Sequence, residues 1–109
     1  MAGSARVVNT PAQAFATQGT THTQLTISSS AVNLLAATPS ELTKSVLVQF
    51  NGADARVTFD GTTPTSSLGF LYTNGSTAYL SRKQAIAAKC IRAGGTDVVA
   101  EIQQLDYLI

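Results

Sequence analysis

The sequence is poor in charge, has no tryptophan, and contains a single cysteine and a single histidine. Charged residues make up 12% of its 109 residues, whereas an ordinary soluble domain carries about 25%. Seven Lys and Arg stand against six Asp and Glu, which gives a net charge of +1. No basic cluster exists that could release counterions from a phosphate backbone, so we expect no nucleic-acid partner.

Long apolar runs and a disulfide pair are missing as well. Cys90 has no second cysteine to pair with, so the chain does not depend on an oxidising compartment. No apolar run approaches the ~20 residues of a membrane span, and residues 1–10 lack the apolar segment of a secretory signal. We therefore expect synthesis in a cytoplasm and no membrane partner.

Hydroxyl side chains take the place of the missing charge. The chain has 15 Thr and 10 Ser, which together are 25 of 109 residues. A long charged side chain loses up to ~2 kcal/mol of rotamer entropy when it is immobilised, and Thr loses much less. Protein interfaces are likewise depleted in Lys and Glu. This composition favours a chain that packs against other protein, and it predicts an assembly of several copies.

The first 23 residues show neither a helical stripe nor sustained alternation of apolar and polar residues. Two interpretations remain open, a disordered tail or an extended arm that orders against a neighbour. Val7, Val8 and Phe15 are more apolar than a solvating tail requires, so we treat them as interface candidates. We assign residues 1–23 to an extended N-terminal arm and residues 24–109 to a single domain.

From residue 24 onward, short alternating segments are separated by turn residues such as Asn51-Gly52, Asn74-Gly75 and Gly94-Gly95. We expect residues 45–50 and 55–59 to pair as one hairpin, and residues 68–72 and 77–80 to pair as a second. The full set of expected strands covers residues 24–28, 32–34, 45–50, 55–59, 68–72, 77–80, 87–92 and 97–105. About eight short strands predict an all-β fold, either a small antiparallel β-sandwich or a barrel-like domain.

Two further segments are less regular. Residues 81–85 predict one helical turn capped by Ser81, and a helix through Ala88 is the alternative because Ala, Lys and Gln favour helices. We prefer a strand that starts at Ala87. Residues 105–109 are apolar enough to need cover, which adds Tyr107, Leu108 and Ile109 to the interface candidates.

No set of residues suggests catalysis. His22 lies in the unpatterned arm without a second histidine, so a solvated side chain is favoured over a zinc ligand. Cys90 has no neighbouring base, which favours a buried structural thiol over a nucleophile. Asp54 and Asp60 stand in turns, where Asp is common without calcium. We expect no enzyme activity, no cofactor and no metal.

The three tyrosines, Tyr72, Tyr79 and Tyr107, could form a stacking platform for bases or sugars. Without interleaved Arg or Lys, packing in the core or in an interface is the favoured interpretation. A carbohydrate-binding module that uses exposed tyrosines remains an alternative.

Most of the chain resembles the small β-sandwich virion proteins of tailed bacteriophages. The residues that carry the resemblance are VLVQFNG at 46–52, VTFDGTTPT at 57–65, GFL at 69–71 and the closing segment 98–107. In such proteins a valine-rich strand and hairpin precede a D-G-x-x-P-T loop, a glycine, another hairpin and two closing strands. The resemblance covers residues 24–109 and leaves the arm without a counterpart.

The resemblance implies a non-enzymatic structural role in a virion. We expect a capsid decoration, or cement, protein that is made in the host cytoplasm and located on the outer capsid surface. Its partners would be the major capsid protein and further copies of itself, with a homo-oligomer at a local three-fold axis, a trimer, as the favoured state. The alternatives are a neck, tail or fibre-anchoring subunit and a carbohydrate-binding module on the virion surface.

Overall fold

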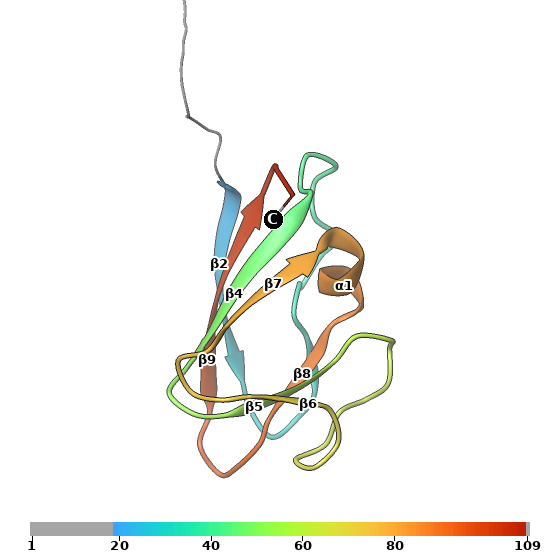
Figure 1. The fold of residues 1–109 in the computed structure, drawn as a ribbon. Helices are drawn as coiled ribbons and strands as arrows, with labels where there is room; N and C mark the ends of the chain where they lie inside the picture. Colours follow the sequence, from blue (N-terminus) through green and yellow to red (C-terminus); the bar gives the residue numbers. More distant parts are fainter. Residues whose placement is uncertain (1–18, 109) are drawn as a thin grey trace, which may run out of the picture.

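A computed structural model describes residues 19–108, and within that range the chain forms eight strands and one helix. The strands are β2 (Gly19–Ile27), β3 (Val32–Asn33), β4 (Ser45–Asn51), β5 (Ala55–Thr58), β6 (Phe70–Tyr72), β7 (Thr77–Ser81), β8 (Lys89–Arg92) and β9 (Val98–Leu105). Helix α1 (Arg82–Ala87) joins β7 to β8 (Figure 1). The expected all-β fold is confirmed, and it is a sandwich.

Two antiparallel sheets of four strands make up the described part of the chain. The first sheet has the order β2-β9-β4-β7, and the second sheet has the order β3-β8-β5-β6. Every connection except that between β5 and β6 passes from one sheet to the other. This alternation is the strand order of a jelly roll, an eight-stranded double sheet built from two Greek keys.

The two expected hairpins are wrong. The turns at Gly52 and Gly75 do form, with φ of 93° and 87°, but β4 and β5 lie in different sheets, and so do β6 and β7. The alternation of apolar and polar residues shows which side of a strand faces the core. It does not show which strand is the neighbour, because the same side faces the core whether a strand pairs with its predecessor or lies in the opposite sheet. The pair β5–β6, joined by the long loop after Thr58, is a pairing that the sequence did not indicate.

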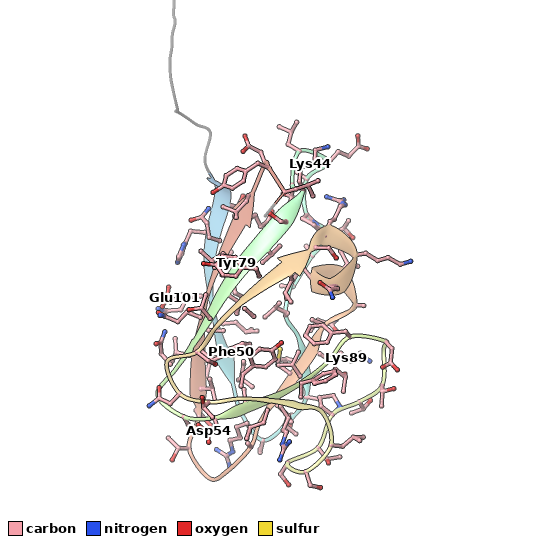
Figure 2. The ribbon with its side chains drawn as sticks, in the orientation of Figure 1. Lys44, Phe50, Asp54, Tyr79, Lys89 and Glu101 are labelled. Atoms are coloured by element: carbon pink, nitrogen blue, oxygen red, sulfur yellow. The ribbon has the colours of Figure 1, made fainter. Side chains whose placement is uncertain are left out.

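The core lies between the sheets and follows the two-residue period of the strands. Val46, Val48 and Phe50 of β4 are buried against Val98, Ala100 and Ile102 of β9 and against residues of the second sheet. The Phe50 ring stacks on the Tyr72 ring of β6, with 5.0 Å between their centroids, and so connects the two sheets. Phe50 lies inside the sandwich in Figure 2.

Helix α1 is capped by Ser81, as the sequence predicts. The Ser81 side chain accepts from the Gln84 backbone N–H, and the Gln84 side chain accepts from the Ser81 N–H, a capping box. The helix extends to Ala87, so the following strand starts at Lys89 and not at Ala87. No helix in the described range is long and apolar enough to cross a membrane.

Strand β2 begins at Gly19, so residues 19–23 belong to the sandwich and not to the expected arm. The segment gave no alternating signal because the side chains of Thr21, His22, Thr23 and Gln24 are all exposed. Pairing with β9 holds it in the sheet, in a register that runs from Gly19 opposite Leu105 to Ile27 opposite Val98.

Candidate interaction surfaces

The start of β2 and the end of β9 meet at one end of the sandwich, which we call the terminal pole and define by Gly19, Leu42, Tyr107 and Leu108. Gly19 pairs with Leu105, and the Leu105 carbonyl accepts from the Lys44 N–H at 2.7 Å. The Ser45 hydroxyl donates to the Tyr107 carbonyl. Both ends of the described chain therefore lie beside the loop that enters β4 (Figure 1).

Three apolar side chains of the terminal pole are open to solvent. Leu42 is 67% exposed, Tyr107 49% and Leu108 76%. Within residues 105–108, Leu105 is buried in the sandwich, whereas Tyr107 and Leu108 are exposed and stay interface candidates. The other interface candidates, Val7, Val8, Phe15 and Ile109, lie outside the described residues. Exposed apolar side chains at one end of the sandwich are candidates for a contact surface.

Arg82 holds the loop that carries Leu42. Its guanidinium donates to the carbonyls of Pro39, Ser40 and Thr43 at 3.1, 2.6 and 3.1 Å. The Thr43 hydroxyl, fully buried, donates to the Gln104 side chain of β9 at 2.9 Å. These bonds fix the loop to α1 and to the first sheet, so Leu42 stands on a rigid support.

The outer face of the first sheet is mostly polar and carries little charge. Its strands are in register across all four positions, so side chains of β2, β9, β4 and β7 form rows. One row is His22, Gln103, Leu47 and Tyr79, and the next is Gln24, Glu101, Gln49 and Thr77. Tyr79 is 60% exposed and, like Glu101, points outward from this face in Figure 2.

His22 is the centre of a hydrogen-bond network on this face. Its Nε2 lies 2.8 Å from a Glu101 carboxylate oxygen, and its Nδ1 lies 3.0 Å from Gln103 Oε1. The Gln103 amide nitrogen donates to the Thr21 and Gln104 carbonyls, which turns Oε1 toward the imidazole as an acceptor. Both ring nitrogens therefore face acceptors, and the doubly protonated imidazolium satisfies both. His22 is exposed, as expected for a solvated side chain, but it also has two side-chain partners that the sequence did not indicate.

These hydrogen bonds also move the pKa values of His22 and Glu101 apart. The hydrogen bond that His22 donates to Glu101, and then the one that it donates to Gln103, raises the pKa of His22. The hydrogen bond from His22, and then that from Gln24, lowers the pKa of Glu101. The sequence could not reveal the network, because its partners are about eighty residues apart and meet only through the β2–β9 register.

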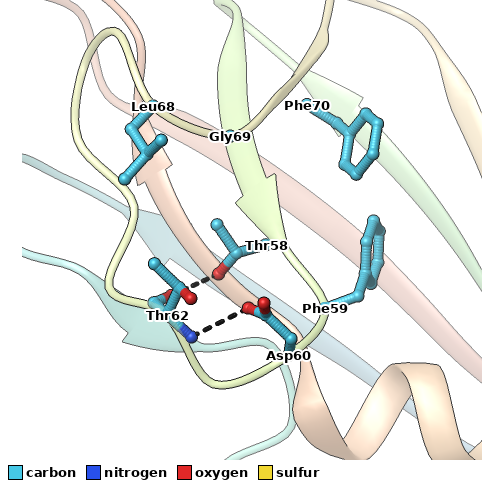
Figure 3. Close-up of a pocket in the computed structure, with 7 residues that line it drawn as sticks. All are labelled: Thr58, Phe59, Asp60, Thr62, Leu68, Gly69 and Phe70. Atoms are coloured by element: carbon cyan, nitrogen blue, oxygen red, sulfur yellow. Dashed lines mark hydrogen bonds between the residues drawn. The ribbon is translucent and has the colours of Figure 1, made fainter.

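A hollow of about 440 Å³ opens beside the loop that joins β5 to β6 (Figure 3). Its apolar wall consists of Phe59, Leu68 and Phe70, and the two phenylalanine rings are 5.9 Å apart between centroids. Phe70 is 67% exposed. Asp60 lies at its edge, where its carboxylate accepts from the Thr62 N–H at 3.0 Å, and this bonding with Thr62 lowers the pKa of Asp60.

The remaining sequence candidates have structural roles. Burial raises the pKa of the Cys90 thiol to about 12, as expected for an inert core cysteine. The Asp54 carboxylate accepts from the Asn74 N–H at 2.8 Å, and the Asn74 side chain accepts from the Gly52 N–H at 2.8 Å, so Asp54 connects two turns. Tyr72 is half-buried on Phe50 and cannot join an exposed platform with Tyr79.

Among residues 19–108, no group of three or more His, Cys, Asp and Glu side chains is arranged to hold a metal ion. Comparisons with protein-family models, with curated proteins and with solved structures find no match to this chain. The surfaces described above are therefore the basis for any functional conclusion.

Proposed function

We propose that this protein is a non-enzymatic virion component, a decoration protein that binds the outer surface of a phage capsid and stabilises the shell. The observation that carries the proposal is the terminal pole. Exposed Leu42, Tyr107 and Leu108 stand there on a rigid support, at the point where residues 1–18 join the sandwich. Attachment through this pole would use the apolar arm residues and the exposed pole residues together.

Two further features support the proposal. The jelly roll is a fold of viral capsid proteins, as well as of lectins and cupins, so the fold suits a shell-associated role by analogy. The outer face of the first sheet is covered mostly by amides and hydroxyls, and it has few of the Lys and Glu side chains that are depleted from protein interfaces. A ligand that binds only the assembled lattice stabilises it by mass action, and many copies make weak individual contacts sufficient.

Co-sedimentation with purified capsids of the phage that encodes the chain tests the proposal. Deletion of residues 1–16 leaves every described strand intact, so we expect a folded domain that no longer sediments with capsids. Leu108→Ser and Leu42→Ser should each weaken binding by roughly ten- to a hundredfold, since an exposed leucine that becomes buried contributes about 1.5–3 kcal/mol.

Leu71→Ser is the matched control, because Leu71 is likewise an exposed leucine, at 48%, but lies on β6, away from the terminal pole. It should bind capsids like the unchanged chain. Undiminished binding of the truncated chain, or equal losses for Leu71→Ser and Leu108→Ser, would contradict attachment through the pole. Copy number per particle separates a decoration protein, present over the whole shell, from a neck or tail subunit, present as a single ring.

A second candidate, carbohydrate binding, is favoured by the hollow of Figure 3. Phe59 and Phe70 offer apolar rings to a sugar face, and the Asp60 carboxylate and the Thr62 hydroxyl lie beside them as hydrogen-bonding groups. A glycan array tests it, with Phe70→Ala expected to abolish any binding and Tyr79→Ala, on the other sheet, expected to leave it unchanged. Binding to no glycan would exclude this candidate.

A further inference from the structure

The four edge strands of the sandwich differ in how well they are protected against pairing with another chain. β3 has two residues and β6 has three, and β7, with five, runs directly into α1. β2 has nine residues, Gly19–Ile27, and contains no proline and no acidic or basic residue apart from His22. Short strands, prolines and charges are the usual means by which a sheet edge is protected against pairing. The one protective feature of β2 is the register irregularity near Gly19.

The alternation of hydrogen bonding identifies the peptide groups on the free edge of β2. The Phe50 N–H donates to Ser76, on the β7 side of β4, so the peptide groups of Leu47 and Gln49 face β9. The β9 residues that pair with them direct their peptide groups toward β4. The intervening residues of β9 direct theirs toward β2, and one of these, Ile102, pairs with Thr23. The peptide groups of His22, Gln24 and Thr26 therefore point away from the sheet.

An independent contact agrees with this assignment. Ser28 has an even number like Gln24 and Thr26, so its peptide group should point the same way as theirs. Its carbonyl indeed points away from β9 and accepts from the Arg92 N–H of the second sheet at 3.1 Å. Within residues 19–108, no backbone bond links the outward peptide groups of β2 between His22 and Thr26 to another segment.

We infer that a second copy of this chain pairs with this edge, β2 against β2 in antiparallel orientation about a two-fold axis at Thr23, so that the two first sheets become one eight-stranded sheet. In this register His22 lies opposite Gln24 of the partner subunit, and Thr23 lies opposite Thr23 of the partner subunit. No like charges face each other, and paired threonines stabilise antiparallel strands. The polar rows of the outer face would continue across the axis.

The other side of β2 also suits a second strand. A groove of about 320 Å³ separates β2 from the loop after β3, and it is lined by Thr21, Thr23 and Leu25 on one side and by Leu35, Ala36 and Pro39 on the other. In the proposed register, Thr21 and Leu25 of the partner subunit project toward this groove. The partner would thus satisfy the free peptide groups and cover apolar wall at the same time.

A single introduced cysteine tests the axis. The peptide groups of Thr23 face β9, so in the dimer it forms a non-hydrogen-bonded pair with Thr23 of the partner subunit, with Cα atoms about 4.5 Å apart, within disulfide range. Thr23→Cys should form a covalent dimer under mild oxidation. Thr96→Cys, exposed in the β8–β9 turn, is the control and should stay largely uncrosslinked, and Cys90 is buried and does not compete.

Light scattering on the full chain gives the second measurement. We expect a mass of twice 11.3 kDa that falls with dilution. Gln24→Pro removes an outward N–H without removing a bond to β9, and it should shift the chain to monomer. Gln24→Ala loses the same side-chain bond to Glu101 but keeps the N–H, so it should remain dimeric.

Circular dichroism on both Gln24 variants verifies that each is folded. A full chain that runs as a monomer, or as the trimer favoured from sequence, would overturn the inference. So would crosslinking of Thr23→Cys no faster than of Thr96→Cys. These measurements need no capsid, so their failure is distinct from failure of the proposed function.

Discussion

The two sheets differ in the length of their strands and in the charge of their outer faces. The first sheet has strands of nine, eight, seven and five residues. The charged groups in its two central rows are Glu101 and His22, which are bonded to each other. The second sheet has strands of two to four residues, and its outer side carries Lys89 and Arg56. The first sheet thus presents the longer and less charged outer face, and the second closes the core and supports the hollow.

The largest change that we expect comes from the contact that joins the two sheets. Phe50→Ala removes a buried ring that stacks on Tyr72 of the opposite sheet, and phenylalanine truncations of this kind cost about 3–5 kcal/mol. Denaturant unfolding followed by circular dichroism measures the loss. Tyr79→Ala, on the exposed face of the first sheet, is the control with an expected change within about 0.5 kcal/mol. Similar losses for both variants would mean that Phe50 does not hold the sheets together.

Gly69→Ala tests how closely the second sheet packs on its own loop. Gly69 has a φ of 126°, and a Cβ there would lie 3.2 Å from both the backbone nitrogen and the carbonyl oxygen of Val57. We expect a loss of roughly 1–3 kcal/mol of unfolding free energy. Gly75→Ala has a similar positive φ of 87° but nothing within 4 Å, so it should cost roughly 1 kcal/mol through strain alone. A larger loss for Gly75→Ala would contradict the role of close packing.

Ser81→Ala tests the helix that carries the chain from the first sheet to the second. The variant removes the capping bond to the Gln84 N–H, and loss of such a cap costs about 1 kcal/mol. Ser76→Ala is a useful comparison, because the buried Ser76 hydroxyl has no hydrogen-bond partner among the described residues. Thermal melts should show a lower midpoint for Ser81→Ala and an unchanged or higher one for Ser76→Ala. The reverse order would count against the cap.

The smallest effect concerns the pH dependence of the outer face of the first sheet. The pKa of His22 is raised from its ordinary value of 6.5, so its contribution to stability is complete below pH 6.5 and is lost as pH rises through the raised pKa. The pKa of Glu101 is lowered from 4.5, so its contribution is present above pH 4.5 and is lost as pH falls through the lowered pKa. Both contributions coexist between about pH 4.5 and 6.5.

Proton NMR of the His22 ring, the chain's one imidazole, measures this titration directly. His22→Gln should flatten the decline in melting temperature above pH 6.5. Glu101→Gln should lower the pKa of the imidazole toward its ordinary value, with the bond to Gln103 still raising it. An unshifted pKa for His22 in the unchanged chain would show that the pair does not form in solution.

The sequence predicted where the strands and turns lie better than which strands pair. The Asn-Gly turns, the Ser81 cap and the buried Cys90 are all determined by neighbouring residues or by burial, which leave local signals. Pairing is determined by distant residues. The turn at Gly52 is fixed by the Asn74 side chain, which comes from the other turn that we had expected to close a separate hairpin.

The same reasoning explains the misplaced start of the sandwich and the missed network. Strand β2 is polar on its exposed side and begins with Gly and Thr, so no alternation marks it, and only the β9 register gives His22 its partners. The hollow likewise depends on Phe59 and Phe70 meeting across a loop of ten residues, Asp60 to Gly69, whose path the sequence does not specify.

The position of the turn between β8 and β9 has a practical consequence. Gly94 and Gly95 are exposed, with open space around both, at the end of the sandwich opposite Gly19 and Leu108 (Figure 1). If the terminal pole binds a capsid as proposed, a foreign peptide inserted between these glycines would be displayed away from the capsid surface. The molecule would then serve as a two-ended adaptor, with cargo at one end and anchorage at the other.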